Sequence, residues 1–287
     1  MAAYNNIHRQ QLFHWIGSHI DASLSGNGGK LDDDARENYV ACLQGALRNG
    51  LWVKTPRDPD FLGKGDLIKV TRPISCFTEW TLGQSLPHTT RYGRLGLGFP
   101  KKFVLARGGQ PLIYVRDSIK NDPYTAALKN LARFLKDDLV GKIPSRKLAA
   151  IREHFDYLSH FNKRIKRQTP PRFVFRKAKK AVAAASKIQK LPDSFVRSFG
   201  TTLHYLEERE WRIVYSNALD EFFDPGSPKT GPDYYLPFVP GRELFAVVLP
   251  DNRTVNMALN NTFIRKKLYP NDAPHVTVLS LQDIGTF

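Results

Sequence analysis

Cysteine is scarce in this sequence of 287 residues, which contains only Cys42 and Cys76. Two cysteines so far apart form neither a disulfide framework nor a metal-binding knot, and their scarcity suits a reducing compartment. No run approaches the roughly 18 apolar residues that a membrane span needs. Residues 1–11 are polar and lack the apolar core of a secretory signal. We therefore expect a cytoplasmic protein with no membrane among its partners.

Familiar catalytic motifs are also missing. The sequence contains no G-x-S-x-G elbow, no Walker A loop, no G-x-G-x-x-G fingerprint and no H-E-x-x-H pair. Three glycines, Gly93, Gly96 and Gly98, suggest a phosphate loop, but no Gly-Lys-Ser/Thr follows them. We expect these glycines to let a strand and a ligand approach each other closely. No set of residues has the spacing of a metal site, so we expect no metal.

Acidic residues are too few to balance the basic ones, since 43 Lys and Arg stand against 27 Asp and Glu. Residues 142–190 hold fifteen of the basic residues and only two acids, and thus most of the net charge of +16. Such a block attracts phosphate backbones and strengthens their binding by counterion release. We expect a nucleic acid, DNA or RNA, to contact Lys163, Arg164, Lys166, Arg167, Arg172, Arg176, Lys177, Lys179 and Lys180. The alternatives are an acidic partner protein, a membrane surface, and a solvated face without a partner.

Hydrophobic periodicity predicts both helices and strands. Helices are predicted over residues 6–24, 35–48, 123–139, 146–161 and 256–268. Strands are predicted over residues 51–53, 67–70, 74–77, 95–99, 112–115, 172–176, 210–215, 244–249 and 275–281. We expect a single α+β domain over residues 1–287, with a mixed, largely antiparallel sheet built from both ends of the chain and a basic helical insertion over residues 120–200.

A few polar side chains lie in apolar surroundings. His14 is flanked by Phe13 and Trp15, where a lone histidine is more often a hydrogen-bonded core residue than a reactive group. Ser75 and Thr78 stand where a strand runs into a turn and can face a ligand, although hydroxyl groups also cap turns. We expect Cys76 to be a small buried apolar residue, and His88 and Tyr92 to face the same side.

Paired carboxylates occur near the end of the chain. Glu208 and Glu210 are two residues apart, so in a strand both point to one face, and Arg212 lies next on that face and can orient Glu210. Carboxylates so close raise each other's pKa, or bind a cation or the hydroxyl groups of a sugar. The alternative is an exposed strand edge that carries charge. A metal-dependent nuclease that uses Glu207 with these two carboxylates ranks lowest, because we find no Asp or His partners.

Several of these segments together resemble the AbiGi family of abortive phage-resistance proteins. The resemblance is good over residues 12–16 and 74–115, fair over 204–215 and absent from the basic middle. It rests on Leu12-Phe13-His14, Ile74 to Glu79, His88, Tyr92-Gly93, Gly96 to Phe99, Pro111 to Val115 and Glu208 to Arg212. Membership would imply the antitoxin-like half of a phage-exclusion system.

The motif order of this family is similar to that of ADP-ribosyltransferase-like folds, which use NAD as a substrate. This similarity implies that the sheet is of the ADP-ribosyltransferase-like type, with His14 on the NAD ribose. It also implies a catalytic Glu210 that stabilises the oxocarbenium-like state as nicotinamide leaves, with Glu208 as the first Glu of the pair. The other cofactor-binding residues would be Ser75, Thr78, His88 and Tyr92. The sequence departs from the pattern at Ser-Cys-Phe-Thr, where Ser-Thr-Ser is usual.

Two hypotheses on function follow. The first is a phage-defence effector, an NAD-dependent ADP-ribosyltransferase that modifies a nucleic acid held by the basic segment. The second is a non-enzymatic antitoxin or regulator that binds nucleic acid, a cognate toxin or a phage protein. An NAD pocket requires His14, Thr78 and Glu210 to converge in one cleft, whereas a protein that only binds makes no such demand.

Overall fold

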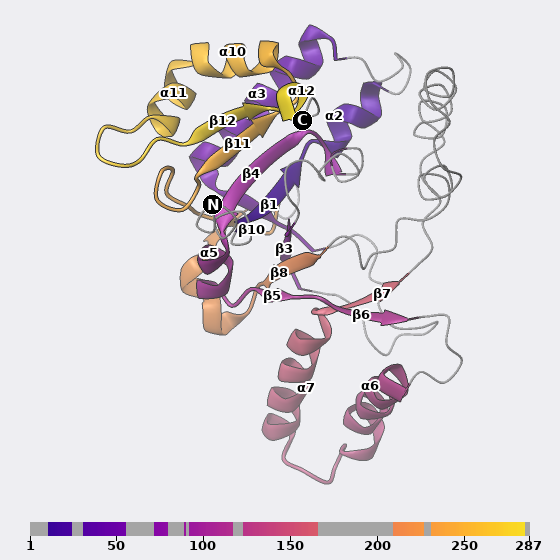
Figure 1. Ribbon diagram of the computed structural model, residues 1–287. Coiled ribbons are helices and arrows are strands. Elements are labelled where there is room, and N and C mark those ends of the chain that lie inside the picture. Colours follow the sequence, from indigo (N-terminus) through magenta and orange to yellow (C-terminus); the bar gives the residue numbers. More distant parts are fainter. Residues whose placement is uncertain are drawn as a thin grey trace, which may run out of the picture.

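A seven-stranded sheet forms the centre of the computed structural model, which describes residues 11–24, 31–55, 72–79, 89, 92–116, 123–165, 209–226 and 231–284. Figure 1 shows strands from both ends of the chain side by side in this sheet. The strand order is β12 (Thr277–Ser280), β11 (Ala246–Leu249), β4 (Leu95–Pro100), β1 (Gln11–Ile16), β3 (Ile74–Thr78), β8 (Glu210–Val214) and β5 (Gln110–Pro111). Strands β11 and β12 run parallel, and the other neighbours run antiparallel. The α+β class and the mixed, mostly antiparallel sheet are confirmed; the ADP-ribosyltransferase-like type stays a prediction.

The larger core lies between one face of this sheet and three helices. It joins sheet residues such as Leu97 and Phe99 to Tyr39, Leu43 and Ile264 of the helices. The helices are α3 (Asp33–Asn49), α10 (Asn252–Asn260) and α11 (Thr262–Leu268). This confirms the helix predicted over residues 35–48.

The single helix predicted over residues 256–268 is two helices in the structure. Asn261 separates them, because its backbone is extended and its side chain accepts hydrogen bonds from the first N–H groups of α11, at Phe263 and Ile264. An Asn side chain of this kind competes with the helical backbone and starts a new helix instead. Helix α10 begins three residues after the end of β11, with Asp251 as its N-cap.

A smaller core covers the other face of the sheet. Phe13 and Trp15 of β1 pack there with Ala246 and Val248 of β11. A Cβ atom on Gly96 would lie 2.6 Å from the Trp15 ring, and one on Gly98 would lie 2.9 Å from the Phe13 ring. The glycines of β4 therefore make room for aromatic rings of the neighbouring strand and not, as predicted from the sequence, for a ligand.

The helix predicted over residues 6–24 is wrong over residues 11–17 and is confirmed only over residues 18–23. Residues 11–16 form β1, which pairs with β4 from Gln11 opposite Pro100 to Ile16 opposite Leu95. A short helix, α2 (Ser18–Ser23), follows Gly17. The apolar residues fit a helical spacing, but they also alternate between the two faces of a strand, and pairing with β4 decides between the two.

Two smaller sheets complete the described fold. One contains β2 (Leu51–Val53), β10 (Tyr234–Leu236) and β9 (Asp224–Pro225), and the other is the parallel pair β6 (Ile113–Arg116) and β7 (Asn162–Ile165). The remaining helices near the sheet are α5 (Lys101–Ala106), η5 (Asn217–Phe222) and α12 (Leu281–Ile284). The predicted strands over residues 51–53, 74–77, 95–99, 112–115, 210–215, 244–249 and 275–281 are confirmed with slightly different ends; those over 67–70 and 172–176 lie outside the described residues.

A helical hairpin projects from the rest of the chain, as Figure 1 shows below the sheet. It comprises α6 (Pro123–Arg133), the π-helical turn η3 (Phe134–Asp138) and α7 (Ser145–Ser159), and lies between β6 and β7. The helices predicted over residues 123–139 and 146–161 are thereby confirmed. The bounds of the insertion, 120–200, stay a prediction. Within the described ranges, no helix is both long and apolar enough to cross a membrane.

Candidate functional site

Three neighbouring strands carry the residues that the sequence singled out. Phe13 of β1 lies opposite Thr78 of β3, and Thr78 lies opposite Glu210 of β8. Directly opposed residues of antiparallel strands share a face of the sheet, and successive residues alternate between faces. Thr78 and Glu210 therefore share the face on which Phe13 packs, together with Arg212, which is two residues after Glu210.

Glu210 and Arg212 form a buried ion pair. The Arg212 Nε donates to Glu210 Oε1 at 2.8 Å, and the two residues are only 3% and 4% exposed. The Arg212 Nη1 also donates to the carbonyl oxygen of His160 at 2.9 Å. Burial alone lowers the pKa of Arg212, but the charge of Glu210 and hydrogen bonds to Glu210 and Cys76 raise this pKa above its ordinary value. The predicted orientation of Glu210 by Arg212 is confirmed, and the alternative of an exposed charged edge is wrong.

His14 lies on the opposite face of the sheet from Glu210. Its Nδ1 is 2.7 Å from the carbonyl oxygen of Cys76, and its ring lies 5.5 Å from that of Phe77 in the larger core. Burial lowers the pKa of His14, against the effect of this hydrogen bond, so the ring is neutral at pH 7 and donates from Nδ1. The interpretation of His14 as a hydrogen-bonded core residue is confirmed.

The other predicted cofactor-binding residues divide between the two faces. Ser75 is 1% exposed and, by alternation along β3, lies on the face of His14. Thr78 donates to the carbonyl oxygen of Phe13 at 3.4 Å. Tyr92 packs against the smaller core, on the face of Thr78 and Glu210. His88 and Glu208 lie outside the described residues. The structure thus brings Thr78, Tyr92 and Glu210 to one face and places His14 and Ser75 on the other.

Cys76 is partly buried and hydrogen-bonded, whereas a small buried apolar residue was predicted. It lies opposite Arg212 in the strand register and makes a side-chain hydrogen bond to the guanidinium group. The thiol is therefore part of the polar cluster around Arg212.

The structure contains a second polar cluster that the sequence did not predict. Glu79, directly after β3, accepts from Lys101 Nζ at 2.6 Å and from the Trp211 indole N–H at 3.0 Å. The Lys101 ammonium group also lies 4.9 Å from the centre of the Trp211 ring. The one available signal was Trp211 itself, because a partly buried indole N–H needs an acceptor. Nothing in the sequence indicated that this acceptor would be Glu79.

Arg72 fastens the hairpin to the sheet. Its Nε lies 2.7 Å from Asp156 Oδ2, and its backbone N–H donates to His160 Nε2 at 3.0 Å. His160 also donates from Nδ1 to the carbonyl oxygen of Asp156, at the end of α7. Burial lowers the pKa of His160 and keeps the ring neutral, which leaves Nε2 free to accept. At the end of α7, His160 therefore accepts from Arg72 through Nε2 and from Arg212 through its carbonyl oxygen.

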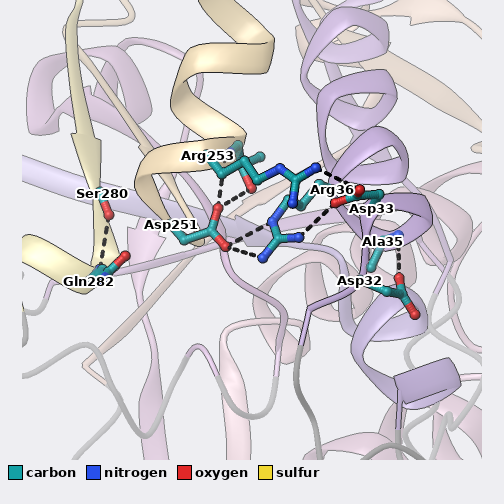
Figure 2. A network of polar contacts seen from close by, with 9 residues as sticks. Asp32, Asp33, Ala35, Arg36, Asp251, Arg253, Ser280 and Gln282 are labelled. Atoms are coloured by element: carbon teal, nitrogen blue, oxygen red, sulfur yellow. Dashed lines mark hydrogen bonds and ion pairs between the residues drawn. The ribbon is translucent and has the colours of Figure 1, made fainter.

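A third polar network joins α3 to α10. Figure 2 shows the Arg36 guanidinium group between Asp33 and Asp251, and Arg253 reaching Asp33 from the first turn of α10. Asp251 also caps α10 through Thr254. Burial raises the pKa of Asp251, but hydrogen bonds from Thr254 and Arg36 lower this pKa below its ordinary value overall. These carboxylates are committed to caps and ion pairs, so the network is a structural clamp.

Few of the predicted nucleic-acid contacts can be placed. Lys163 and Arg164 lie in β7, opposite Tyr114 and Val115. The other seven residues lie outside the described part of the chain, and the nucleic-acid interface stays a prediction. Where the chain is described, no group of three or more His, Cys, Asp or Glu could hold a metal ion.

The comparisons with known proteins yield one match. A family model described as "Putative abortive phage resistance protein AbiGi, antitoxin" matches residues 58–221. No curated protein and no solved structure matches. The match covers more than half of the chain and runs through the basic middle, where the sequence motifs had shown no resemblance. It includes β3, the helical hairpin and the Glu210–Arg212 pair. This chain therefore belongs to the AbiGi family of abortive phage resistance proteins.

Proposed function

We propose that this chain is a non-enzymatic antitoxin of a phage-defence system and restrains a cognate toxin by binding it. The observation that supports this most is the state of Glu210. A catalytic carboxylate has to reach the reacting atoms of its substrate. Glu210 is 4% exposed, and its Oε1 already accepts from Arg212. We therefore assign this carboxylate a structural role.

The position of His14 supports the same proposal. In an NAD pocket, His14 and Glu210 would contact the same nucleotide, but the strand register places them on opposite faces of the sheet. The Nδ1 of His14 is also engaged by a backbone carbonyl. The family description as an antitoxin agrees with a protein that acts by binding.

The rival proposal is NAD-dependent ADP-ribosyl transfer to a nucleic acid. The observation in its favour is that Thr78 and Glu210 lie directly opposite each other, with Tyr92 on the same face. A pocket on that face could then use Glu210 on the ribose and Tyr92 against nicotinamide, without His14. In this proposal Glu210 must exchange Arg212 for the substrate.

One experiment separates the two proposals. The toxin is co-expressed with the wild type, with Glu210→Gln, or with Glu79→Gln, directly after the neighbouring strand β3, as the matched control. Growth rescue, the melting temperature of each purified variant and nicotinamide release from labelled NAD are measured. We expect no nicotinamide release from any protein, and a growth rescue that follows the melting temperature across the three. Nicotinamide release by the wild type that disappears in a normally stable Glu210→Gln variant would establish the transferase instead.

A further inference from the structure

Large apolar side chains are exposed on the helical hairpin. Nine large apolar residues are exposed in the described part of the chain, and five of them belong to the hairpin: Leu131, Phe134, Val140, Ile151 and Leu158. Single exposed apolar residues are normal on a protein surface. Their concentration on one short element is not, and such patches commonly mark sites of protein association.

The spacing of these residues places exposed apolar side chains next to one another on each helix, as an apolar stripe. Ile151 and Leu158 are seven residues apart and so lie on the same side of α7, two turns from each other. They are 42% and 64% exposed. Leu131 and Phe134 are three residues apart and are neighbours in the same way. Other apolar residues of the hairpin are buried, namely Ala132, Leu135 and Leu148.

Exposed basic side chains lie on the same hairpin as these stripes, and we call them the basic border. The hairpin contains seven Lys or Arg and four Asp or Glu. Two of the four acids, Glu153 and Asp156, pair with Arg72 and so are partly neutralised. Among the hairpin residues whose side chains are described, the exposed basic ones are Arg133, Lys142, Arg146, Lys147 and Arg152. The exposed acids are Asp137, Asp138 and Glu153, so the described surface of the hairpin is apolar with a border that is positive on balance.

This combination selects one kind of partner. A second copy of the chain would bring like charges together, because the net charge is +16. Nucleic acid would use the basic border and could stack a base on Phe134, but the four exposed Leu, Ile and Val side chains neither hydrogen-bond phosphates nor stack on bases. A protein surface with an apolar centre and carboxylates around it matches both features.

We propose that the hairpin face formed by Leu131, Phe134, Ile151 and Leu158 docks the cognate toxin, through an apolar patch of the toxin that is bordered by carboxylates. This inference rests on the proposed antitoxin function and names the surface that carries it out. The Arg72 and His160 contacts hold α7 in place before the partner arrives, which lowers the entropic cost of association.

The test compares two pairs of exposed apolar residues. Ile151 and Leu158 are replaced together by Ser, and the control replaces Leu105 and Val239 together by Ser. The control residues are each 49% exposed and lie outside the hairpin. The affinity of each full-length variant for the purified toxin is measured by calorimetry, and a melting curve confirms that each is folded. We expect the hairpin variant to bind at least about tenfold more weakly, and the control to bind like the wild type.

A second variant tests the border. Arg146→Glu combined with Lys147→Glu adds negative charge on the hairpin without touching the apolar residues. We expect slower association with the toxin and a weaker dependence of the association rate on salt concentration.

The possible failures are distinguishable. Wild-type affinity of the Ile151 and Leu158 variant would overturn the docking surface and leave the antitoxin function standing. A wild-type protein that does not bind the toxin would overturn both. Loss of binding to a labelled random-sequence RNA or DNA duplex, with toxin binding intact, would show that the hairpin is a nucleic-acid interface instead.

Discussion

Removing one member of the Glu210–Arg212 pair should destabilise the protein strongly. Arg212→Met keeps most of the side-chain volume but leaves the Glu210 carboxylate without its guanidinium partner, although Glu210 is 4% exposed. Breaking a buried ion pair in this way costs about 3–5 kcal/mol. A domain of this size loses roughly 2–4 °C of melting temperature per kcal/mol, so we expect a decrease of about 6–20 °C.

The double variant Glu210→Leu with Arg212→Met provides the matched control. It removes both charges of the pair, and its remaining defects are the His160 carbonyl oxygen and the Cys76 thiol, which lose their hydrogen bonds to Arg212. An unpaired buried acceptor costs about 1–3 kcal/mol. The double variant should therefore be more stable than Arg212→Met alone, despite carrying one more substitution.

Thermal melts and urea unfolding of the four proteins of this cycle measure the coupling between the two residues. If Arg212→Met costs less than about 1 kcal/mol, the protein tolerates the loss of the guanidinium partner of Glu210, and Glu210 is not the structural carboxylate that we infer. The same holds if the two single changes add without coupling. Glu210 would then have to be examined again as a reactive group.

Three further predictions concern other parts of the fold. Burial holds the pKa of His160 below that of the unfolded chain, so below about pH 6.5 the unfolded chain binds more protons than the folded protein. Melting curves should therefore show stability falling from about pH 6.5 towards pH 5, and falling less steeply in His160→Asn. An unchanged slope in that variant would contradict the neutral ring that accepts from Arg72. Gly96→Ala should cost about 1–3 kcal/mol in urea unfolding, because the new Cβ meets the Trp15 ring at 2.6 Å; a gain in stability, as for an ordinary Gly→Ala change, would contradict this packing. Asp251→Ala should cost about 1–2 kcal/mol in the same assay, since both the cap of α10 and an ion pair are lost; a change within about 0.5 kcal/mol would show that the clamp adds nothing.

Local patterns predicted part of this fold well. The alternation in residues 210–215 predicted β8 and placed Arg212 beside Glu210, because side-chain direction in a strand depends only on parity. The same reasoning failed for residues 11–16, where apolar residues fit both a helix and a strand. What decided that case was pairing with β4, whose glycines accept the rings of Phe13 and Trp15.

The division of the candidate site between two faces could not be predicted. Whether His14 and Glu210 share a face depends on the register of β1, β3 and β8, and a shift of one residue would reverse the answer. The partners of Glu79 could not be predicted either, because Lys101 and Trp211 come from distant parts of the chain. A motif order that matches an NAD-binding family therefore does not by itself place the residues in one pocket.

The structure also gives Glu210, Trp211 and Arg212 a role that needs no catalysis. Trp211 and Arg212 are consecutive in β8, so their side chains leave opposite faces of the sheet. Trp211 donates to Glu79 on one face, while Arg212 binds Glu210 and the carbonyl oxygen of His160 on the other. His160 ends the helix that carries Ile151 and Leu158. The buried pair therefore supports the base of the surface that we propose as the toxin-docking face. A substitution at Glu210 can then weaken growth rescue by loosening the hairpin, and loss of function there is evidence for catalysis only when the melting temperature and the toxin affinity are unchanged.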